Sequence, residues 1–176
     1  MPFRRKTTRE AAERTYVVLV EQARRPAFFT ELGVPDTLDG RFELICLHVF
    51  LYLRRLKGAG GSAAELGQRL VDTMFADFDR SLREIGTGDL SVGRQVKRMA
   101  EAFYGRIRAY EDGLAAGLLD EDETLRAALA RNLYGTVSAS PPQVARMARY
   151  LRGAAAELAA QPAASLLAGD VVLGAP

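Results

Sequence analysis

The stretch 39–57 constrains the fold more than any other part of this sequence. On a helix, its apolar residues cover nearly every side, with Phe42, Val49 and Leu53 on one face and Leu44 and Leu51 on others. A helix that is apolar nearly all round is stable in water only when other elements cover it. The sequence therefore predicts an all-α fold, a single compact domain of about six helices around this central helix.

The neighbouring helices are indicated by apolar residues at spacings of three and four, and by residues that start and stop helices. Asp39 is a candidate N-cap of the central helix. Ser62 with Glu65 and Ser140 with Gln143 form candidate capping boxes. The pattern predicts helices at residues 8–24, 39–57, 62–85, 90–117, 120–132 and 140–160.

The chain divides into three predicted parts. Its 176 residues are the usual length of one domain, and they contain no internal repeat, strand pattern or linker. Residues 1–7 are predicted to form a basic flexible leader, and residues 8–160 the helical domain. Residues 161–176 lack helical periodicity and are expected to form an irregular or disordered tail.

The composition excludes several function classes. The 24 Lys and Arg residues nearly balance the 22 Asp and Glu residues, so the net charge of +2 gives no overall field for DNA. The longest apolar stretch is far shorter than the ~20 residues of a membrane-spanning helix. Cys46, the single cysteine, excludes an internal disulfide and fits a reducing compartment. We therefore expect a cytoplasmic protein, with a peripheral position at the inner (cytoplasmic) membrane as the alternative.

Catalytic and metal-binding residue sets are missing from the sequence. One histidine and one cysteine cannot form a zinc site of cysteines and histidines, and no Glu-x-x-His motif is present for a carboxylate-bridged metal pair. No serine lies in a Gly-x-Ser-x-Gly turn, and no glycine-rich loop carries the lysine of a phosphate-binding loop. We therefore expect no enzymatic activity, no metal and no cofactor.

His48 is the one side chain suited to acid–base chemistry near neutral pH. Its place in the middle of the most apolar helix is typical of a core or interface histidine with satisfied hydrogen bonds. The alternative is a small helical enzyme or ligand-binding protein in which His48 works with a nearby carboxylate, Asp72 or Asp79. A closed pocket with His48 within hydrogen-bond reach of a carboxylate would favour this alternative.

The predicted helix at 62–85 carries ordered charges. One interpretation is a solvated face with ion pairs of Asp79 with Arg83 and of Arg80 with Glu84. The other is a recognition surface in which acids and arginines surround an exposed aromatic side chain, Phe75. Pattern alone favours the first, since charge on a helix face is the default.

The N-terminus is basic and provides a further alternative. Arg4, Arg5, Lys6 and Arg9, followed by Arg14, could contact RNA, the ribosome or anionic lipid. A ribosome- or RNA-binding module acting through this segment would lose its binding when residues 1–14 are removed.

The middle of the chain contains several distinctive blocks. They are Gly33–Ile45 with Leu47–Leu51 and Arg54–Leu56, Gln68–Glu84, Gly88–Gly93, and Phe103–Arg106 with Ala109–Glu111. In their residues and their order, these blocks resemble the ubiquinol-cytochrome c chaperone family. The resemblance implies an assembly chaperone for the respiratory ubiquinol-cytochrome c reductase.

The resemblance also implies partners. Mitochondrial relatives bind newly made cytochrome b, associate with the ribosome that makes it, and act with a small partner protein. Here the first helix starts with no long presequence before it, so the chain looks like a bacterial member. We therefore expect cytochrome b as the partner, keep the ribosome as a further candidate, and do not expect the small partner protein.

We predict a client-binding face on the helices at 39–57 and 62–85, which would hold nascent cytochrome b until haem is inserted. Its polar residues fall inside the resembling blocks, and charge around an aromatic side chain suits transient binding of an apolar segment. For Arg41, a buried ion pair with Asp72 or Asp79 is the alternative to client contact. The predicted face comprises Arg41, His48, Asp72, Phe75, Asp79, Arg80, Arg83 and Glu84.

Overall fold

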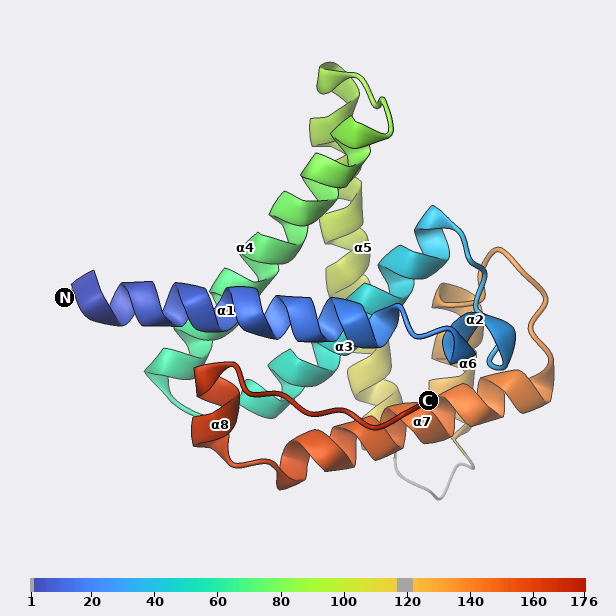
Figure 1. The fold of residues 1–176 in the computed structure, drawn as a ribbon. Coiled ribbons are helices and arrows are strands. Elements are labelled where there is room, and N and C mark those ends of the chain that lie inside the picture. Colours follow the sequence, from blue (N-terminus) through green and yellow to red (C-terminus); the bar gives the residue numbers. More distant parts are fainter. Residues whose placement is uncertain (1, 117–121) are drawn as a thin grey trace.

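A computed structural model describes residues 2–116 and 122–176 and confirms the predicted all-α fold (Figure 1). No strand occurs in these two ranges. The predicted end of the helix at 90–117 and the predicted start of the helix at 120–132 lie outside the described residues. The helices are α1 (Pro2–Ala23), α2 (Ala27–Thr30), α3 (Leu38–Leu56), α4 (Gly61–Glu84), α5 (Asp89–Ala115), α6 (Glu123–Asn132), α7 (Pro141–Ala160) and α8 (Ala163–Ala168).

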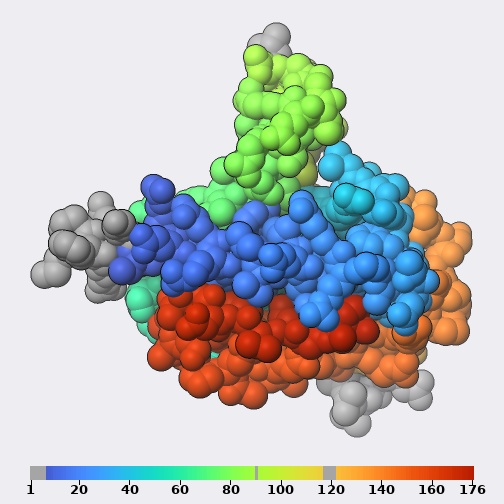
Figure 2. All heavy atoms as spheres, in the orientation of Figure 1, coloured from blue at the N-terminus to red at the C-terminus, as the bar shows by residue number. Residues whose placement is uncertain are grey.

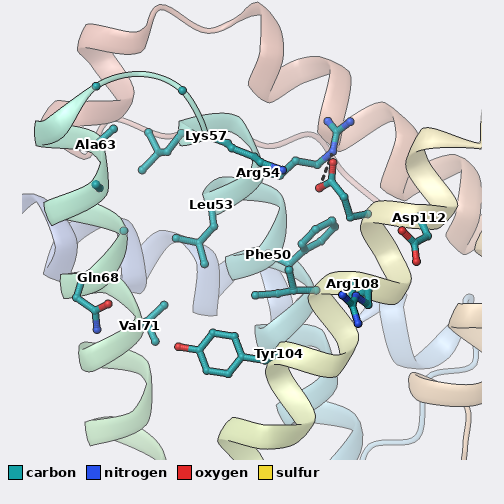
Figure 3. A pocket seen from close by; sticks show the side chains of 17 residues that line it. Phe50, Leu53, Arg54, Lys57, Ala63, Gln68, Val71, Tyr104, Arg108 and Asp112 are labelled. Carbon is teal, nitrogen blue, oxygen red and sulfur yellow. Dashed lines mark ion pairs between the residues drawn. The ribbon is translucent and has the colours of Figure 1, made fainter.

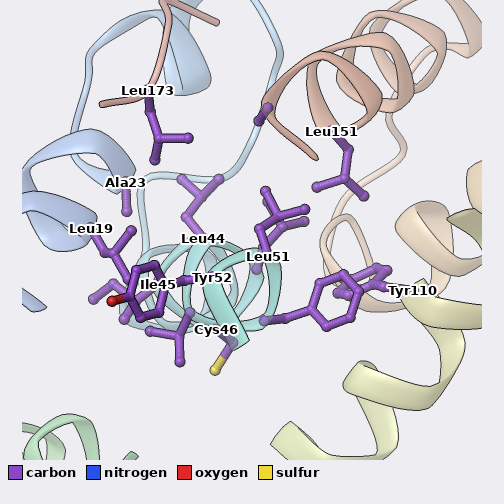
Figure 4. Packing of buried hydrophobic residues seen from close by; sticks show 14 of the residues in the cluster. Leu19, Ala23, Leu44, Ile45, Cys46, Leu51, Tyr52, Tyr110, Leu151 and Leu173 are labelled. Atoms are coloured by element: carbon purple, nitrogen blue, oxygen red, sulfur yellow. The ribbon is translucent and has the colours of Figure 1, made fainter. Parts of the chain in front are cut away.

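The central helix of the fold is α3, as predicted. Helices α1, α4, α5 and α7 all pack against it, and every residue from Phe42 to Tyr52 is buried. Figure 4 shows Leu19 of α1, Tyr110 of α5 and Leu151 of α7 around it. These contacts explain why the middle of α3 is mostly apolar, because a helix covered from several sides has no face left in water.

The N-terminus of α3 is capped by a different residue from the one predicted. The hydroxyl of Thr37 accepts a hydrogen bond from the backbone N–H of Gly40 at 3.2 Å. Asp39 lies inside the first turn, where its negative charge is favourable at the positive end of the helix dipole. The N-cap is therefore Thr37 and not Asp39.

Of the two predicted capping boxes, the one at the start of α7 is present. The backbone N–H of Ser140 donates to Oε1 of Gln143 at 3.0 Å. Helix α4 instead begins after Gly60, whose φ of +94° is strained for other residues. Ser62 and Glu65 consequently lie within the helix.

The N-terminal end of the chain differs from the expected flexible leader. Helix α1 begins at Pro2, so residues 2–7 continue the helix. No helix-breaking residue separates them from the apolar stripe that starts at Ala12. Proline at the first position of a helix is well tolerated, because its missing N–H would have no partner there in any case.

The C-terminal segment 161–176 packs on the body, and residues 170–176 have no regular secondary structure, which is the irregular alternative of the expected tail and not the disordered one. It contains α8 and buries Leu166, Val171 and Leu173. The side-chain amide of Gln161 donates to the carbonyl of Val172 at 2.8 Å and accepts from its N–H at 3.0 Å. Side-chain hydrogen bonds and isolated buried residues order this segment, and neither produces a periodic pattern.

Helices α4 and α5 extend beyond the other helices as an antiparallel pair (Figures 1 and 2). Residues 75–103, called the arm below, form this extension together with its base, where Phe78 packs on Phe42 of α3 and Tyr16 of α1 donates to Asp77. The rings of Phe75, Phe78 and Phe103 pack in it, and the ring centroids of Phe75 and Phe103 are 6.0 Å apart. Near its tip Ile85 is 63% exposed. The arm therefore has aromatic side chains packed at its base, and solvent surrounds its tip.

The crossing of α5 with α6 predicts opposite effects for two glycines of α5. A Cβ at Gly113 would lie 2.8 Å from Cα of Leu125, so Gly113→Ala must push α6 away. A Cβ at Gly105 meets nothing within 4 Å. We expect Gly113→Ala to lower the free energy of unfolding by about 1–3 kcal/mol and Gly105→Ala to raise it by about 0.5–1 kcal/mol. Urea denaturation measures both, and a stabilising Gly113→Ala would contradict the close helix crossing.

Candidate functional site

A cleft of about 620 Å³ lies where the C-terminal half of α3 meets α4 and α5 (Figure 3). Its walls are largely apolar and come from all three helices. Tyr104 of α5, with 58% of its surface exposed, lies at the mouth and points toward α4. The apolar lining residues are Phe50, Leu53, Leu56, Ala63, Ala64, Val71 and Ile107.

Small residues on the first turns of α4 keep this cleft open. Ala63, Ala64 and Gly67 line it, and a Cβ at Gly67 would come within 3.1 Å of Leu53. Larger side chains at these positions would fill the space between α3 and α4. The loop that precedes α4 contains Gly58 in the left-handed region, with a φ of +85°, which turns the chain at the edge of the cleft.

Charged residues of both signs surround the cleft. Nε of Arg54 lies 3.4 Å from Oε2 of Glu111, and about a third of each side chain is exposed. This nitrogen is buried and has no hydrogen-bond partner in the described part of the chain, so the pair is a loose electrostatic contact. Lys57, Arg108 and Asp112 complete the charged lining. An apolar floor with a mixed-charge rim suits binding of a polypeptide segment better than acid–base chemistry.

The exposed edge of α4 continues from the cleft along the arm. Nε2 of Gln68 donates to Oδ1 of Asp72 at 2.8 Å, beside the cleft. Farther along, Nε of Arg83 donates to Oδ2 of Asp79 at 2.6 Å, which confirms the predicted ion pair. The guanidinium of Arg83 lowers the pKa of the Asp79 carboxyl below its usual value. Because these residues repeat at helical spacing, they form one continuous edge.

Two residues of the predicted face take other roles on α4. Arg80 forms its ion pair with Asp77 and not with Glu84. Phe75 is half-buried against Phe78 and Phe103, so it supports the arm and is not the exposed aromatic side chain that was predicted. Among the described side chains, the aromatic residue that is largely exposed is Tyr104 of α5. The sequence contained a sign of this exposure. Tyr104 directly follows the core residue Phe103, and successive side chains on a helix point about 100° apart, so Tyr104 points away from the core.

Arg41 does not form the predicted buried ion pair. Its Nε donates to Oδ1 of Asp36 at 2.7 Å, and both side chains are more than half exposed. Arg41 lies at the start of α3, whereas Asp72 and Asp79 lie on α4. The short loop before α3 supplies the carboxylate, and Arg41 pairs with neither Asp72 nor Asp79.

His48 is fully buried in a hydrogen-bond network that joins three helices. Its Nδ1 lies 2.7 Å from the carbonyl oxygen of Leu44 and its Nε2 lies 2.7 Å from the hydroxyl of Tyr150. The amide of Gln22 in α1 donates to the same hydroxyl at 3.0 Å. Since a carbonyl only accepts, Nδ1 carries the proton and Nε2 accepts from Tyr150. Burial lowers the pKa of His48 to about 4.

This network removes the support for a catalytic His48. Both ring nitrogens are occupied, and in the described ranges no carboxylate contacts the ring. Asp72 and Asp79, the proposed partners, are on the solvent side of α4. The structure thus places His48 in the core and leaves it outside the predicted client-binding face.

The described arginines of the basic N-terminus make contacts within the chain. Nε of Arg9 donates to Glu13 at 3.0 Å, and Arg14 donates to the carbonyl oxygen of Ala168. The side chains of Arg4, Arg5 and Lys6 lie outside the described residues. No observation on α1 therefore favours an RNA or ribosome contact.

The described helices lack the features of a membrane span and of a metal site. None of them is long and apolar enough to cross a bilayer. Within residues 2–116 and 122–176, no three or more His, Cys, Asp or Glu side chains gather closely enough to hold a metal ion.

Comparison with known proteins identifies the family. The pattern that defines the ubiquinol-cytochrome C chaperone family matches residues 30–173, so the chain belongs to this family. Its members are chaperones and assembly factors without catalytic activity, which confirms that the chain is not an enzyme. The predicted resemblance is likewise confirmed.

Relatives of known role cover most of the chain. Ubiquinol-cytochrome-c reductase complex assembly factor 1 of Xenopus laevis is 30% identical over 142 residues, which are 81% of this chain and 69% of the frog protein. The Homo sapiens protein of the same name is 29% identical over 142 residues but is matched over only 46% of its length. The chain thus spans less than half of the human relative.

A solved structure shows the same fold. The crystal structure of the Cbp3 homolog from Brucella abortus superposes with a TM-score of 0.84 at 36% sequence identity. The superposition covers 96% of this chain and 91% of the Brucella chain. The arm, the central α3 and the packed C-terminal segment therefore belong to an architecture shared with a relative.

The burial of His48 predicts a pH-dependent stability. The His48 side chain titrates near pH 6.5 in the unfolded chain and near pH 4 in the folded chain. Between these pH values the unfolded state therefore binds more protons than the folded state. Stability is complete above pH 6.5 and falls as the pH drops toward 4, by up to about 1.4 kcal/mol per pH unit. Urea denaturation between pH 7 and pH 5 measures this slope.

A variant isolates the contribution of the histidine. The chain contains one histidine, so His48→Gln removes this titration completely. We expect the variant to be less stable at pH 7 and to show a much smaller slope between pH 6.5 and 5. An unchanged slope in the variant would assign the pH dependence to carboxylates.

Proposed function

We propose that this chain is an assembly factor of ubiquinol-cytochrome c reductase that binds newly synthesised cytochrome b. The observation that carries the proposal is the apolar cleft with its charged rim, in a chain that belongs to the ubiquinol-cytochrome C chaperone family. Named relatives from Xenopus laevis and Homo sapiens are assembly factors of the same complex. Cytochrome b as the client is our inference from the family resemblance.

The dimensions of the cleft suit a short apolar segment. A volume of about 620 Å³ lies within the range of sites that enclose a ligand of several side chains. Leu53, Val71 and Ile107 would bury apolar side chains of the client, while Lys57 and Arg108 face its polar flanks. A small apolar contact of this kind binds reversibly, which a chaperone needs in order to release its client.

We place further client contacts on the exposed edge of α4. Asp72, Asp79, Arg80, Arg83 and Glu84 extend from the cleft along the arm and would bind polar residues that flank the apolar segment. Phe75 would act indirectly, by holding α4 against α5. His48 is left out because it is buried. Arg41, at the other end of α3, would contact the client only if the client extends past the body.

We also propose that the protein works beside the membrane into which cytochrome b inserts. The client segment is apolar before insertion and needs cover while it waits for its partners and haem. A peripheral position would keep the cleft near the bilayer. The ribosome and a small partner protein are not included, because nothing in the described contacts favours either.

Photo-crosslinking at two equally exposed positions tests the site. A photoreactive amino acid in place of Tyr104 lies at the cleft mouth, and one in place of Val17 lies on α1 away from the cleft. The two native side chains are 58% and 53% exposed. We expect crosslinks to cytochrome b from position 104 and none from position 17. Equal yields from both would remove the cleft from the binding site.

Changes on the arm test the α4 edge separately. Asp79→Ala with Arg83→Ala removes an exposed ion pair, which contributes little to stability. We expect weaker crosslinking from position 104 in this variant, with an unchanged helical circular dichroism spectrum. Normal crosslinking would limit the site to the cleft.

Deletion of the gene in its host tests the function itself. We expect cytochrome b and quinol-oxidising activity to fall, and the intact chain to restore both. Unchanged levels of both in the deletion strain would contradict the proposed function, whatever the crosslinking shows.

A further inference from the structure

A second pocket, of about 480 Å³, lies at the other end of α3. It is lined by the first turn of α3, the middle of α5 and the end of α6, with Leu82 of α4 at its side. The cleft, by contrast, is lined by Phe50 and later residues of α3. The two cavities therefore share α5 but open at different ends of the central helix.

Three arginines line this second pocket, and one of them is fixed in place. Arg106 binds both carboxylate oxygens of Glu43, which is itself buried. Its guanidinium carbon also lies 5.8 Å from the centre of the Phe42 ring. Arg106 and Glu43 thus form a rigid wall whose charges are largely balanced.

The other two arginines have no ion-pair partner in the part of the chain that the structure describes. Arg98 of α5 and Arg131 of α6 line the pocket from different helices, and neither forms an ion pair or hydrogen bond in the described ranges. The N-terminal turn of α3 adds partial positive charge to the same cavity. The three arginine side chains that line the pocket outnumber its two carboxylates, Asp39 and Glu43.

The pocket is also partly apolar. Leu82, Met99 and Leu133 line it beside the arginines, together with the ring of Phe42. A free inorganic anion would leave this apolar surface unused. A ligand that fits both parts carries an acidic group next to an apolar side chain.

We propose that this pocket docks an acidic segment of a partner protein, with a carboxylate between Arg98 and Arg131 and a neighbouring apolar side chain against Leu82 and Met99. Arginine pairs with carboxylates in a planar, two-pronged geometry, and guanidinium groups on two walls of a cavity can hold one carboxylate between them. A membrane surface fits less well, because lipid phosphates lie in a plane and the arginines line a cavity.

The proposal does not rest on the proposed client. It concerns a different cavity and can be tested with the purified chain. The probe is a fluorescent heptapeptide of alternating Asp and Leu, and its control is the same peptide with Asn in place of Asp. Fluorescence anisotropy gives the dissociation constants at low and at physiological salt.

Matched variants separate the pocket from general charge. The pocket pair is the double variant Arg98→Gln and Arg131→Gln, which removes one positive charge from α5 and one from α6 within the pocket. The control pair is the double variant Lys97→Gln and Arg126→Gln, which removes one positive charge from each of the same helices at exposed positions that do not line the pocket. We expect the pocket pair to weaken binding of the acidic peptide at least about tenfold, and the control pair to change it by less than about twofold.

The outcomes decide the proposal. Stronger binding of the acidic peptide than of its Asn control, lost only in the pocket pair and weakened by salt, supports it. Equal losses in the two pairs would overturn it in favour of non-specific attraction. Absence of peptide binding by the native chain would also overturn it, and binding of phosphatidylserine vesicles in that case would assign the arginines to lipid.

Discussion

The burial of α3 is the constraint on which the rest of the structure depends. Every residue from Phe42 to Tyr52 is buried, including two that are polar. A buried polar side chain needs partners, and each of these two has one partner on another helix. Arg106 of α5 pairs with Glu43, and Tyr150 of α7 bonds to His48. The polar residues of α3 thus fix where α5 and α7 pack, while its apolar residues supply the driving force.

The length of the helices explains why an arm is present. Helices α4 and α5 have 24 and 27 residues, whereas α3 has 19. The pair is therefore longer than the core that it covers, and its outer part stands in solvent. At the base of the arm Phe75 packs on Phe103 and Phe78 packs on Phe42 of α3, and ion pairs such as Asp79 with Arg83 cover the outer part. The ordered charges of α4 and the projection of the arm thus both follow from the length of α4 and α5 relative to the core.

Features set by a repeating local pattern were predictable from the sequence, and features set by one tertiary contact were not. The central helix follows from the apolar residues around all sides of 39–57, and the Asp79–Arg83 pair from its spacing on one helix. The partner of Arg41 depends on how the preceding loop folds, and the sequence suggested the wrong carboxylate. Tyr104 was missed because its exposure depends on how α5 packs beside α3 and the first half of α4 at the cleft. The choice of Thr37 over Asp39 as N-cap depends on a single turn.

Complete cover of the middle of α3 also decides where ligands can bind. A side chain in the centre of that stretch is enclosed by other helices, as His48 shows. The two cavities described above accordingly lie toward the ends of α3, with the cleft lined by residues from Phe50 onward and the arginine pocket by residues up to Glu43. Their chemistry follows from α5, which presents Tyr104 and Ile107 to the first and Arg98 and Arg106 to the second. One helix therefore gives the two ends of α3 different specificities, apolar at one and anionic at the other.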